Sequence, residues 1–249
     1  MNGNIPVFLN HTHKVQPHEC GPDGKVNLKG ILDYFQDIAS AHADLLNVGL
    51  EEMLRLRQIW VLSRLKVQIR KMPELGETLT VTTYPSGLNK LFATRQYSLC
   101  NEKGEFLCGA SSFWLMVDKE KLRVVRPFKE LAVYAELNKD KAIYFPEIDK
   151  IAERESNSGV VADYTVRHSH IYLNDHLNTA WYGSFIEDTL GELAGNRVGI
   201  TEFQINFLQS CSLHTKVECK GVLADGTFYV EGRDSSNNQL CFQSEGTVR

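Results

Sequence analysis

The densest run of side chains that could do chemistry lies between residues 167 and 178. It contains three histidines, two asparagines, an aspartate and a tyrosine, and it leads directly into an amphipathic segment. An imidazole can act as a general base near neutral pH, and an amide can orient a water or a carbonyl oxygen. The first backbone N–H groups of a helix also stabilise negative charge. These residue types predict a polar site at the start of a helix.

Two pairs of histidines raise the alternative of a zinc site. His11 and His13 form one pair, and His168 and His170 form the other, so each pair would share one face of an extended strand. Structural and catalytic zinc ions need further ligands, and neither pair has a cysteine or a carboxylate at ligand spacing. We therefore expect no metal ion and no other cofactor.

An internal repeat shows how this run is positioned. Asn27 and the segment after it match Asn178 and its following segment at a constant offset of 151 residues. Both segments place apolar residues with a period near 3.6, which predicts two amphipathic helices. Each asparagine can cap its helix by accepting from a free backbone N–H group. The loop at residues 21–27 has no histidine, so at most one of the two related sites is expected to be catalytic.

Strands are predicted after each helix. Residues 65–69 and 203–207 alternate apolar and polar side chains and match at an offset of 138 residues. Further strands are expected at residues 78–84, 91–100, 105–117, 215–223, 228–232 and 239–248. Residues 118–158 carry more charge and two prolines, which predicts a linker with a short helix near residues 128–136.

Each predicted unit of one helix and one antiparallel sheet would leave a hydrophobic sheet edge uncovered. Two such units are expected to pair edge to edge, giving one continuous sheet around two central helices. The sequence therefore predicts an α+β fold of two tandem repeats. We place the first repeat and the linker in residues 1–150 and the second repeat in residues 151–249.

Composition narrows the classes of function. The chain has 249 residues, 43% hydrophobic residues and a net charge of −4, which allows a full core and lacks the basic surface of a nucleic-acid binder. It contains no apolar run long enough to span a membrane and no N-terminal leader pattern. Its six cysteines include no Cys-x-x-Cys pair and are expected to be reduced, which fits a soluble, cytoplasmic protein.

Several short motifs occur together in one order. Asn174-x-His176-x-Asn178 precedes an aromatic helix, and the first half contains Gly21-Pro22-Asp23-Gly24-Lys25, Trp60-Val61-Leu62-Ser63-Arg64 and Pro73-x-x-Gly76-Glu77. These motifs resemble those of the bacterial and plant acyl-acyl-carrier-protein (acyl-ACP) thioesterases, in which the first has the form Asp-x-Asn-x-His-x-Asn. The resemblance covers nearly the whole chain and implies a tandem, or double, hot-dog fold.

The resemblance also implies a reaction, namely hydrolysis of a fatty acyl thioester on the phosphopantetheine arm of acyl carrier protein in fatty acid biosynthesis. This thioesterase reaction needs an activated water and donors for the carbonyl oxygen as negative charge develops on it. His176 is expected to act as the base or to hold the water, and Asn174 to orient the water or the carbonyl. Backbone N–H groups behind Asn178 are expected to be the donors. The expected partner is acyl carrier protein, with no nucleic acid and no membrane, and a homodimer is an open alternative.

Two positions depart from the family pattern, and both concern carboxylates. The aspartate of the signature is Tyr172 here, and a glutamate expected in the following strand region aligns with Ser210, while Cys211 keeps the family's cysteine. His170 and Glu187 are candidate substitutes, although Glu187 falls opposite the apolar face of its helix, which predicts a solvated or linker-facing role. Cys211 could alternatively act as a thiolate nucleophile.

Residues that contact the substrate are predicted less directly. Trp60 is expected to line an acyl cavity, and His42 lies on the apolar face of the first helix, which borders the acyl chain in such folds. For Asn178 the alternative is a helix cap, and for His42 it is a core histidine. Lysines and arginines between residues 64 and 126 could attract an acidic carrier protein.

Three competing functions remain open. An acyl-CoA thioesterase would need contacts to the adenosine phosphate that the sequence does not reveal. A non-catalytic acyl-thioester binding protein is favoured by the missing carboxylates at Tyr172 and Ser210. A hot-dog dehydratase would need a histidine of one repeat to face an acid of the other, and the sequence does not show that pairing.

Overall fold

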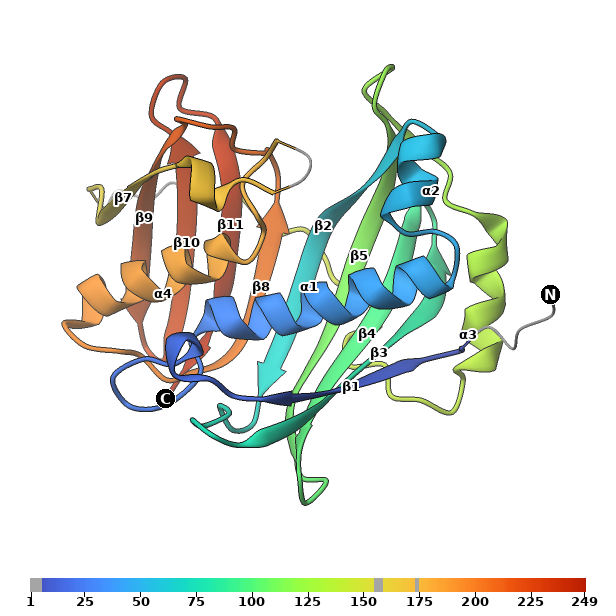
Figure 1. The fold of residues 1–249 in the computed structure, drawn as a ribbon. Helices are drawn as coiled ribbons and strands as arrows, with labels where there is room; N and C mark the ends of the chain where they lie inside the picture. The colour runs from blue at the N-terminus through green and yellow to red at the C-terminus, as the bar shows by residue number, and fades with distance from the viewer. Residues whose placement is uncertain (1–5, 155–158, 173–174) are drawn as a thin grey trace.

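In residues 6–154, 159–172 and 175–249, which the computed structural model describes, eleven strands form one antiparallel sheet around two long helices (Figure 1). The helices are α1 (Leu28–Leu45), α2 (Leu50–Arg55), α3 (Val133–Leu137) and α4 (Trp181–Ala194). The strands are β1 (Leu9–Lys14), β2 (Gln58–Ile69), β3 (Thr78–Asn89), β4 (Phe92–Asn101), β5 (Phe106–Asp118), β6 (Arg123–Val125), β7 (Ala162–Thr165), β8 (Ile200–Phe207), β9 (Lys216–Ala224), β10 (Thr227–Asp234) and β11 (Leu240–Val248).

The strand order is β1-β3-β4-β5-β2-β8-β11-β10-β9-β7, with β6 paired to β5. The strands of the first half and those of the second half therefore occupy separate parts of the sheet, and β2 and β8 join the two parts. This confirms the prediction of one continuous sheet built from two helix-and-sheet repeats. A boundary at residue 150 stays a prediction.

The joint between the repeats is nearly symmetric. Lys66 of β2 lies opposite Gln204 of β8, and Leu65 and Val67 lie opposite Ile205 and Phe203. Lys66 and Gln204 are also equivalent in the alignment at an offset of 138 residues. The antiparallel pairing thus relates the two repeats by an approximate two-fold axis near these residues.

Helix α1 forms where its sequence pattern predicts it. Asn27 is its N-cap, with its side-chain oxygen accepting from the backbone N–H of Gly30 at 2.7 Å. The buried face includes Leu28, Ile31 and Phe35. The helix therefore lies with its apolar face against the sheet.

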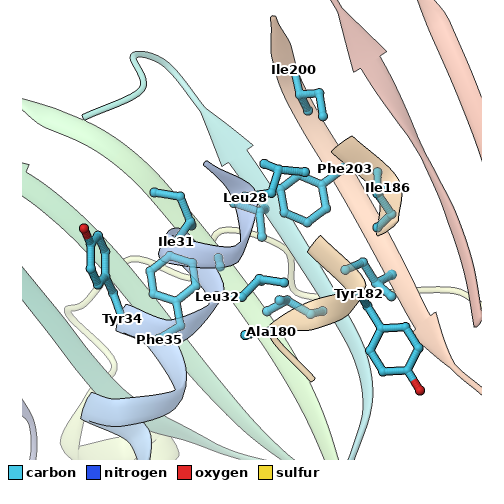
Figure 2. Packing of buried hydrophobic residues seen from close by; sticks show 14 of the residues in the cluster. Leu28, Ile31, Leu32, Tyr34, Phe35, Ala180, Tyr182, Ile186, Ile200 and Phe203 are labelled. Atoms are coloured by element: carbon cyan, nitrogen blue, oxygen red, sulfur yellow. The ribbon is translucent and has the colours of Figure 1, made fainter. Parts of the chain in front are cut away.

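Both helices contribute to one hydrophobic core. Leu28 of α1, Ile186 of α4 and Phe203 of β8 are fully or almost fully buried in the same cluster (Figure 2). Gly183 lets α4 approach the first turn of α1, since a Cβ there would lie 3.0 Å from the Leu28 backbone and from the Leu32 side chain. The position of α4 against α1 thus depends on this glycine.

Strands β1, β6 and β7 and helix α2 were not predicted. Strands β1 and β7 are short edge strands that pair on one side only, with β3 and β9 respectively, and β1 is mostly exposed. Their weak alternation explains why pattern analysis missed them. Helix α2 has six residues, too few to give a helical period. No helix in the described part of the chain is long and apolar enough to cross a membrane.

Candidate active site

The polar run before α4 folds into a tight loop. The backbone N–H of Tyr172 donates to the carbonyl of His176 at 2.8 Å, and that of Asp175 donates to the carbonyl of Tyr172 at 3.0 Å. Ile171 and Leu177 close the loop as a β-bridge. Asp175 turns the chain with a φ of 60° and is exposed. The loop thereby brings Tyr172 and His176 close together, four residues apart in the sequence.

Tyr172 and His176 both border a mostly apolar cavity of about 310 Å³. The cavity lies between the second half of α1, helix α2, the first residues of β2 and the start of α4. Of the predicted site residues, those that line it are Tyr172, His176, Asn178, Ser210 and Trp60. Asn174, the remaining polar member of the signature, lies outside the described residues.

The chain just before α4 forms a capped turn that borders this cavity. Asn178 accepts from the N–H of Ala180 through its side chain at 2.9 Å and from the N–H of Trp181 through its carbonyl at 3.0 Å. Asn178 thus caps a turn that precedes the helix, and α4 itself begins at Trp181, two residues later than a cap at Asn178 would suggest. Within the described residues, the N–H of Thr179 donates to no other group, and Thr179 lines the cavity.

Gln36 of α1 reaches the same turn. Its side-chain oxygen accepts from the hydroxyl of Thr179 at 2.8 Å, and Gln36 lines the cavity. Its side-chain amide nitrogen can therefore donate toward the cavity. Gln36 and Thr179 were not predicted as site residues. The offset of 151 residues, which pairs Gln36 with Glu187 and Thr179 with Leu28, is the signal that could have found them.

The contact related to this one by the internal repeat joins α4 to the start of α1 and includes salt bridges. Glu187 of α4 accepts from the backbone N–H of Leu28 at 2.9 Å and pairs with Arg197 at 2.8 Å. Its side chain is only 16% exposed. The prediction of a solvated or linker-facing Glu187 was wrong, because α4 crosses the start of α1 and turns this position inward.

Arg197 fills the space in front of the first repeat's loop. Its guanidinium donates to the carbonyls of Lys25 at 3.2 Å and Val26 at 2.9 Å, and it also pairs with Asp23. A Cβ on Gly21, which aligns with Tyr172, would lie 2.6 Å from Nη1 of Arg197. The first of the two related sites is therefore occupied by an arginine, whereas the second opens to the cavity.

Cys211 does not reach the cavity wall. It is 1% exposed, and the hydroxyl of Tyr182 donates to its sulfur at 3.5 Å. Hydrogen bonds from the thiol of Cys241 and from Tyr182 lower the pKa of the Cys211 thiol. Its burial leaves no path for a substrate carbonyl, so the structure gives no support to a nucleophilic Cys211. Its neighbour Ser210 is exposed and lines the cavity.

His42 lies behind the cavity rather than in its wall. The ring is fully buried, with Nε2 donating to the carbonyl of Pro6 at 2.9 Å and Nδ1 accepting from Arg95 at 3.1 Å. Burial, together with the positive charge of Arg95, lowers the pKa of His42 to about 4. The prediction of direct substrate contact is not supported, although Arg95, the partner of His42, does line the cavity.

His170 does not replace the missing carboxylates. Its ring lies against Trp181, with the two ring centres 4.3 Å apart, and its Nδ1 accepts from the backbone N–H of Arg167 at 3.3 Å. Burial lowers the pKa of His170.

Trp60 lies where it was predicted, in the wall of the cavity. Its Nε1 donates to the carbonyl of Val48 at 2.8 Å.

A continuous antiparallel sheet around two helices, with an imidazole beside an apolar cavity, is the architecture expected of a double hot-dog protein. Residues 7–134 match the acyl-ACP thioesterase N-terminal domain, and residues 153–245 match the acyl-ACP thioesterase C-terminal domain. The chain therefore belongs to the acyl-ACP thioesterase family.

Individual relatives agree with this assignment. A chloroplastic palmitoyl-acyl carrier protein thioesterase of Arabidopsis thaliana is 29% identical over 231 residues, which are 86% of this chain and 52% of that protein. A chloroplastic dodecanoyl-[acyl-carrier-protein] hydrolase of Cinnamomum camphora is 21% identical, covering 89% of this chain and 61% of its own length. The chain spans about half the length of several curated relatives that it matches.

Solved structures confirm the fold. An acyl-ACP thioesterase from Bacteroides thetaiotaomicron superposes with a TM-score of 0.83 at 20% identity, covering 97% of this chain and 98% of the other. A 12:0-ACP thioesterase from Umbellularia californica also gives a TM-score of 0.83, at 17% identity, covering 98% of this chain and 94% of the other. The predicted double hot-dog fold is thus confirmed over nearly the whole chain.

Proposed function

We propose that this protein hydrolyses fatty acyl-ACP to a free fatty acid and ACP. The observation that carries the proposal is that His176 lines the same cavity as Thr179, whose backbone N–H donates to no other described group. A base and an unused backbone donor beside an apolar cavity are what thioester hydrolysis requires. The family of the chain and the printed names of its relatives support the same reaction.

The reaction follows from the proposed placement of the substrate. The acyl chain lies in the cavity, and the thioester carbonyl oxygen accepts from the backbone N–H of Thr179. His176 removes a proton from water as the water oxygen bonds to the carbonyl carbon. The negative charge that forms on the carbonyl oxygen is stabilised by the Thr179 N–H and by the positive end of α4. Collapse of this intermediate breaks the C–S bond, and the protonated His176 returns its proton to the leaving thiolate.

The replaced carboxylates change how the water is held. Tyr172 and Ser210 offer hydroxyl groups at the cavity where the family pattern has acids. The side-chain amide of Gln36 is a third group on the same wall. Hydroxyl and amide groups can orient a water but cannot stabilise the imidazolium as a carboxylate does. We infer that turnover depends on His176 alone as the base.

The carrier is proposed to be ACP rather than coenzyme A. Several exposed cations, Lys119, Arg123 and Arg126, lie in or next to the β5–β6 hairpin. This hairpin pairs with Gln58 at the start of β2, which lines the cavity. Cations beside the cavity would attract an acidic carrier protein. A cytoplasmic location and a homodimer stay predictions.

The first test is thiol release from acyl-ACP. We expect the wild type to release thiol and His176→Ala to lower kcat/KM by about 100- to 10,000-fold, the usual contribution of a general base. His168→Ala is the matched control, because His168 is exposed and outside the cavity lining, and it should leave kcat/KM unchanged. Equal rates for wild type and His176→Ala would remove His176 from the mechanism.

A non-catalytic acyl-thioester binding protein is the second candidate, favoured by Tyr172 and Ser210 in place of acids. It predicts tight binding of acyl-ACP by the wild type without thiol release.

A second experiment tests the carrier by presenting the same acyl chain on ACP and on coenzyme A. A large preference for the CoA thioester would contradict ACP as the substrate.

A further inference from the structure

A buried arginine forms part of the cavity wall. Arg95 of β4 is 9% exposed and lines the cavity. It shares one face of β4 with Tyr97 and Leu99, which are buried in the core. A charged side chain therefore stands where the strand pattern otherwise places core residues.

Among the described residues, no carboxylate pairs with this guanidinium. Arg95 donates from Nη1 to Nδ1 of His42 at 3.1 Å and to the hydroxyl oxygen of Thr83 at 3.2 Å. Both partners are uncharged, because burial lowers the pKa of His42 to about 4. None of the ion pairs among the described residues involves Arg95. The guanidinium has further N–H donors on Nε and Nη2, and these remain for a ligand.

An unsubstituted hydrocarbon chain is a poor occupant for this part of the cavity. It would displace water from the guanidinium without offering an acceptor, and a buried cation without compensation is costly. An oxygen atom on the chain would accept from the free N–H groups in surroundings where such bonds are strong. The remaining wall, which includes Ala39, Ala43 and Met53, suits methylene groups.

The distance between Arg95 and the thioester end of the cavity can be estimated from contacts along α1. Gln36 contacts the turn before α4, whereas His42, six residues further along α1, contacts Arg95. A helix rises 1.5 Å per residue, so Arg95 lies roughly 9 Å beyond the thioester end of the cavity. A substituent in the middle of a medium-length chain, or at the end of a short one, would reach it.

We propose that the preferred substrates are oxygen-bearing acyl chains, whose hydroxyl, keto or terminal carboxylate group accepts hydrogen bonds from Arg95. This proposal rests on the proposed hydrolysis of acyl thioesters at His176. It assigns Arg95 as a specificity-determining residue at the distal part of the cavity. A purely structural Arg95, which would only hold His42 and the segment at Pro6, predicts no preference among chains.

The test compares acyl-ACP substrates of equal chain length. One carries no substituent, one carries a mid-chain hydroxyl group, and one ends in a carboxylate placed about 9 Å from the thioester carbon. For the wild type we expect kcat/KM to be at least tenfold higher for an oxygen-bearing chain than for the plain chain. Arg95→Met should bring this ratio to one or below, and Arg95→Lys should keep part of it. Arg70→Met, at an exposed arginine outside the cavity lining, should keep the ratio of the wild type.

The outcomes separate this proposal from the proposed function. A wild type that prefers the plain chain, or a preference unchanged in Arg95→Met, would overturn it. If Arg95→Met does not fold, as judged by circular dichroism, the wild-type ratio and the Arg95→Lys variant decide. If no substrate is hydrolysed, calorimetric titration of the wild type with the matched free acids still decides, since binding of the oxygen-bearing acid at least tenfold tighter than the plain acid supports the role of Arg95 and equal binding contradicts it.

Discussion

His42 couples the stability of the fold to pH. Burial lowers its pKa to about 4, whereas a histidine in an unfolded chain titrates near 6.5. Between these values the unfolded chain binds a proton that the folded protein excludes, so the stabilising contribution is complete above pH 6.5 and is lost as the pH falls toward 4. A buried neutral ring that serves as acceptor for Arg95 is therefore sensitive to acid.

We expect the free energy of unfolding to fall by on the order of 1–2 kcal/mol through this residue between pH 7 and pH 4.5. His42→Gln should flatten that part of the pH profile, because glutamine can donate to the Pro6 carbonyl and accept from Arg95 without titrating. Urea unfolding of both proteins at several pH values measures the difference. Parallel profiles would contradict the role assigned to His42.

Among single residues, those that align with the family motifs were the most accessible to prediction. His176, Tyr172 and Ser210 occur in a recognisable sequence context, and all three line the cavity. Arg95 was not singled out, because a charge in a strand is usually solvated and its partners come from α1 and β3. The alternation of Arg95 with buried Tyr97 was the available signal. The hydrogen bonds of Cys211 with Tyr182 and Cys241 could not be predicted, since both residues approach it from distant segments.

Among the elements, the helices and the main strands follow from local patterns, whereas their mutual approach does not. The capping asparagine and the apolar period predict α1, and the same pattern repeated 151 residues later predicts α4. Which polar residue faces the other helix depends on how closely the helices pack at Gly183. The inward orientation of the Glu187 side chain results from that packing, and the sequence pattern of α4 alone does not predict it.

The contacts of Arg197 with the loop before α1 are expected to hold the two repeats together. Arg197→Met removes the donors to the Lys25 and Val26 carbonyls and leaves the Glu187 carboxylate with only the Leu28 N–H. We expect a loss of about 2 kcal/mol in the free energy of unfolding, measured by urea titration.

The control for Arg197 is an ordinary surface ion pair. Arg154 pairs with Glu245, and the two side chains are 57% and 36% exposed, so Arg154→Met should cost less than about 1 kcal/mol. Equal effects of the two substitutions would mean that the contacts of Arg197 with the loop before α1 contribute no more than a surface pair.

At the scale of the whole molecule, the two repeats share one core and one sheet. The buried cluster includes residues of both helices, and β2 pairs with β8 across the joint. We expect residues 1–150 and residues 151–249, produced separately, to lack cooperative unfolding, because each half would expose the pairing edge and the apolar face that the other covers. Circular dichroism during urea titration measures this. A half that unfolds cooperatively with a stability close to that of the whole chain would contradict it.

The near-symmetric pairing of Lys66 with Gln204 has a consequence for how such a chain can change. In an assembly of two identical subunits, every substitution is inherited twice, so neither site can be altered without altering the other. Joining the copies in one polypeptide removes that constraint. In this chain Arg197 fills the space at the first repeat's loop, whereas the second repeat's loop borders the cavity. A substitution at one of these two places therefore leaves the other unchanged.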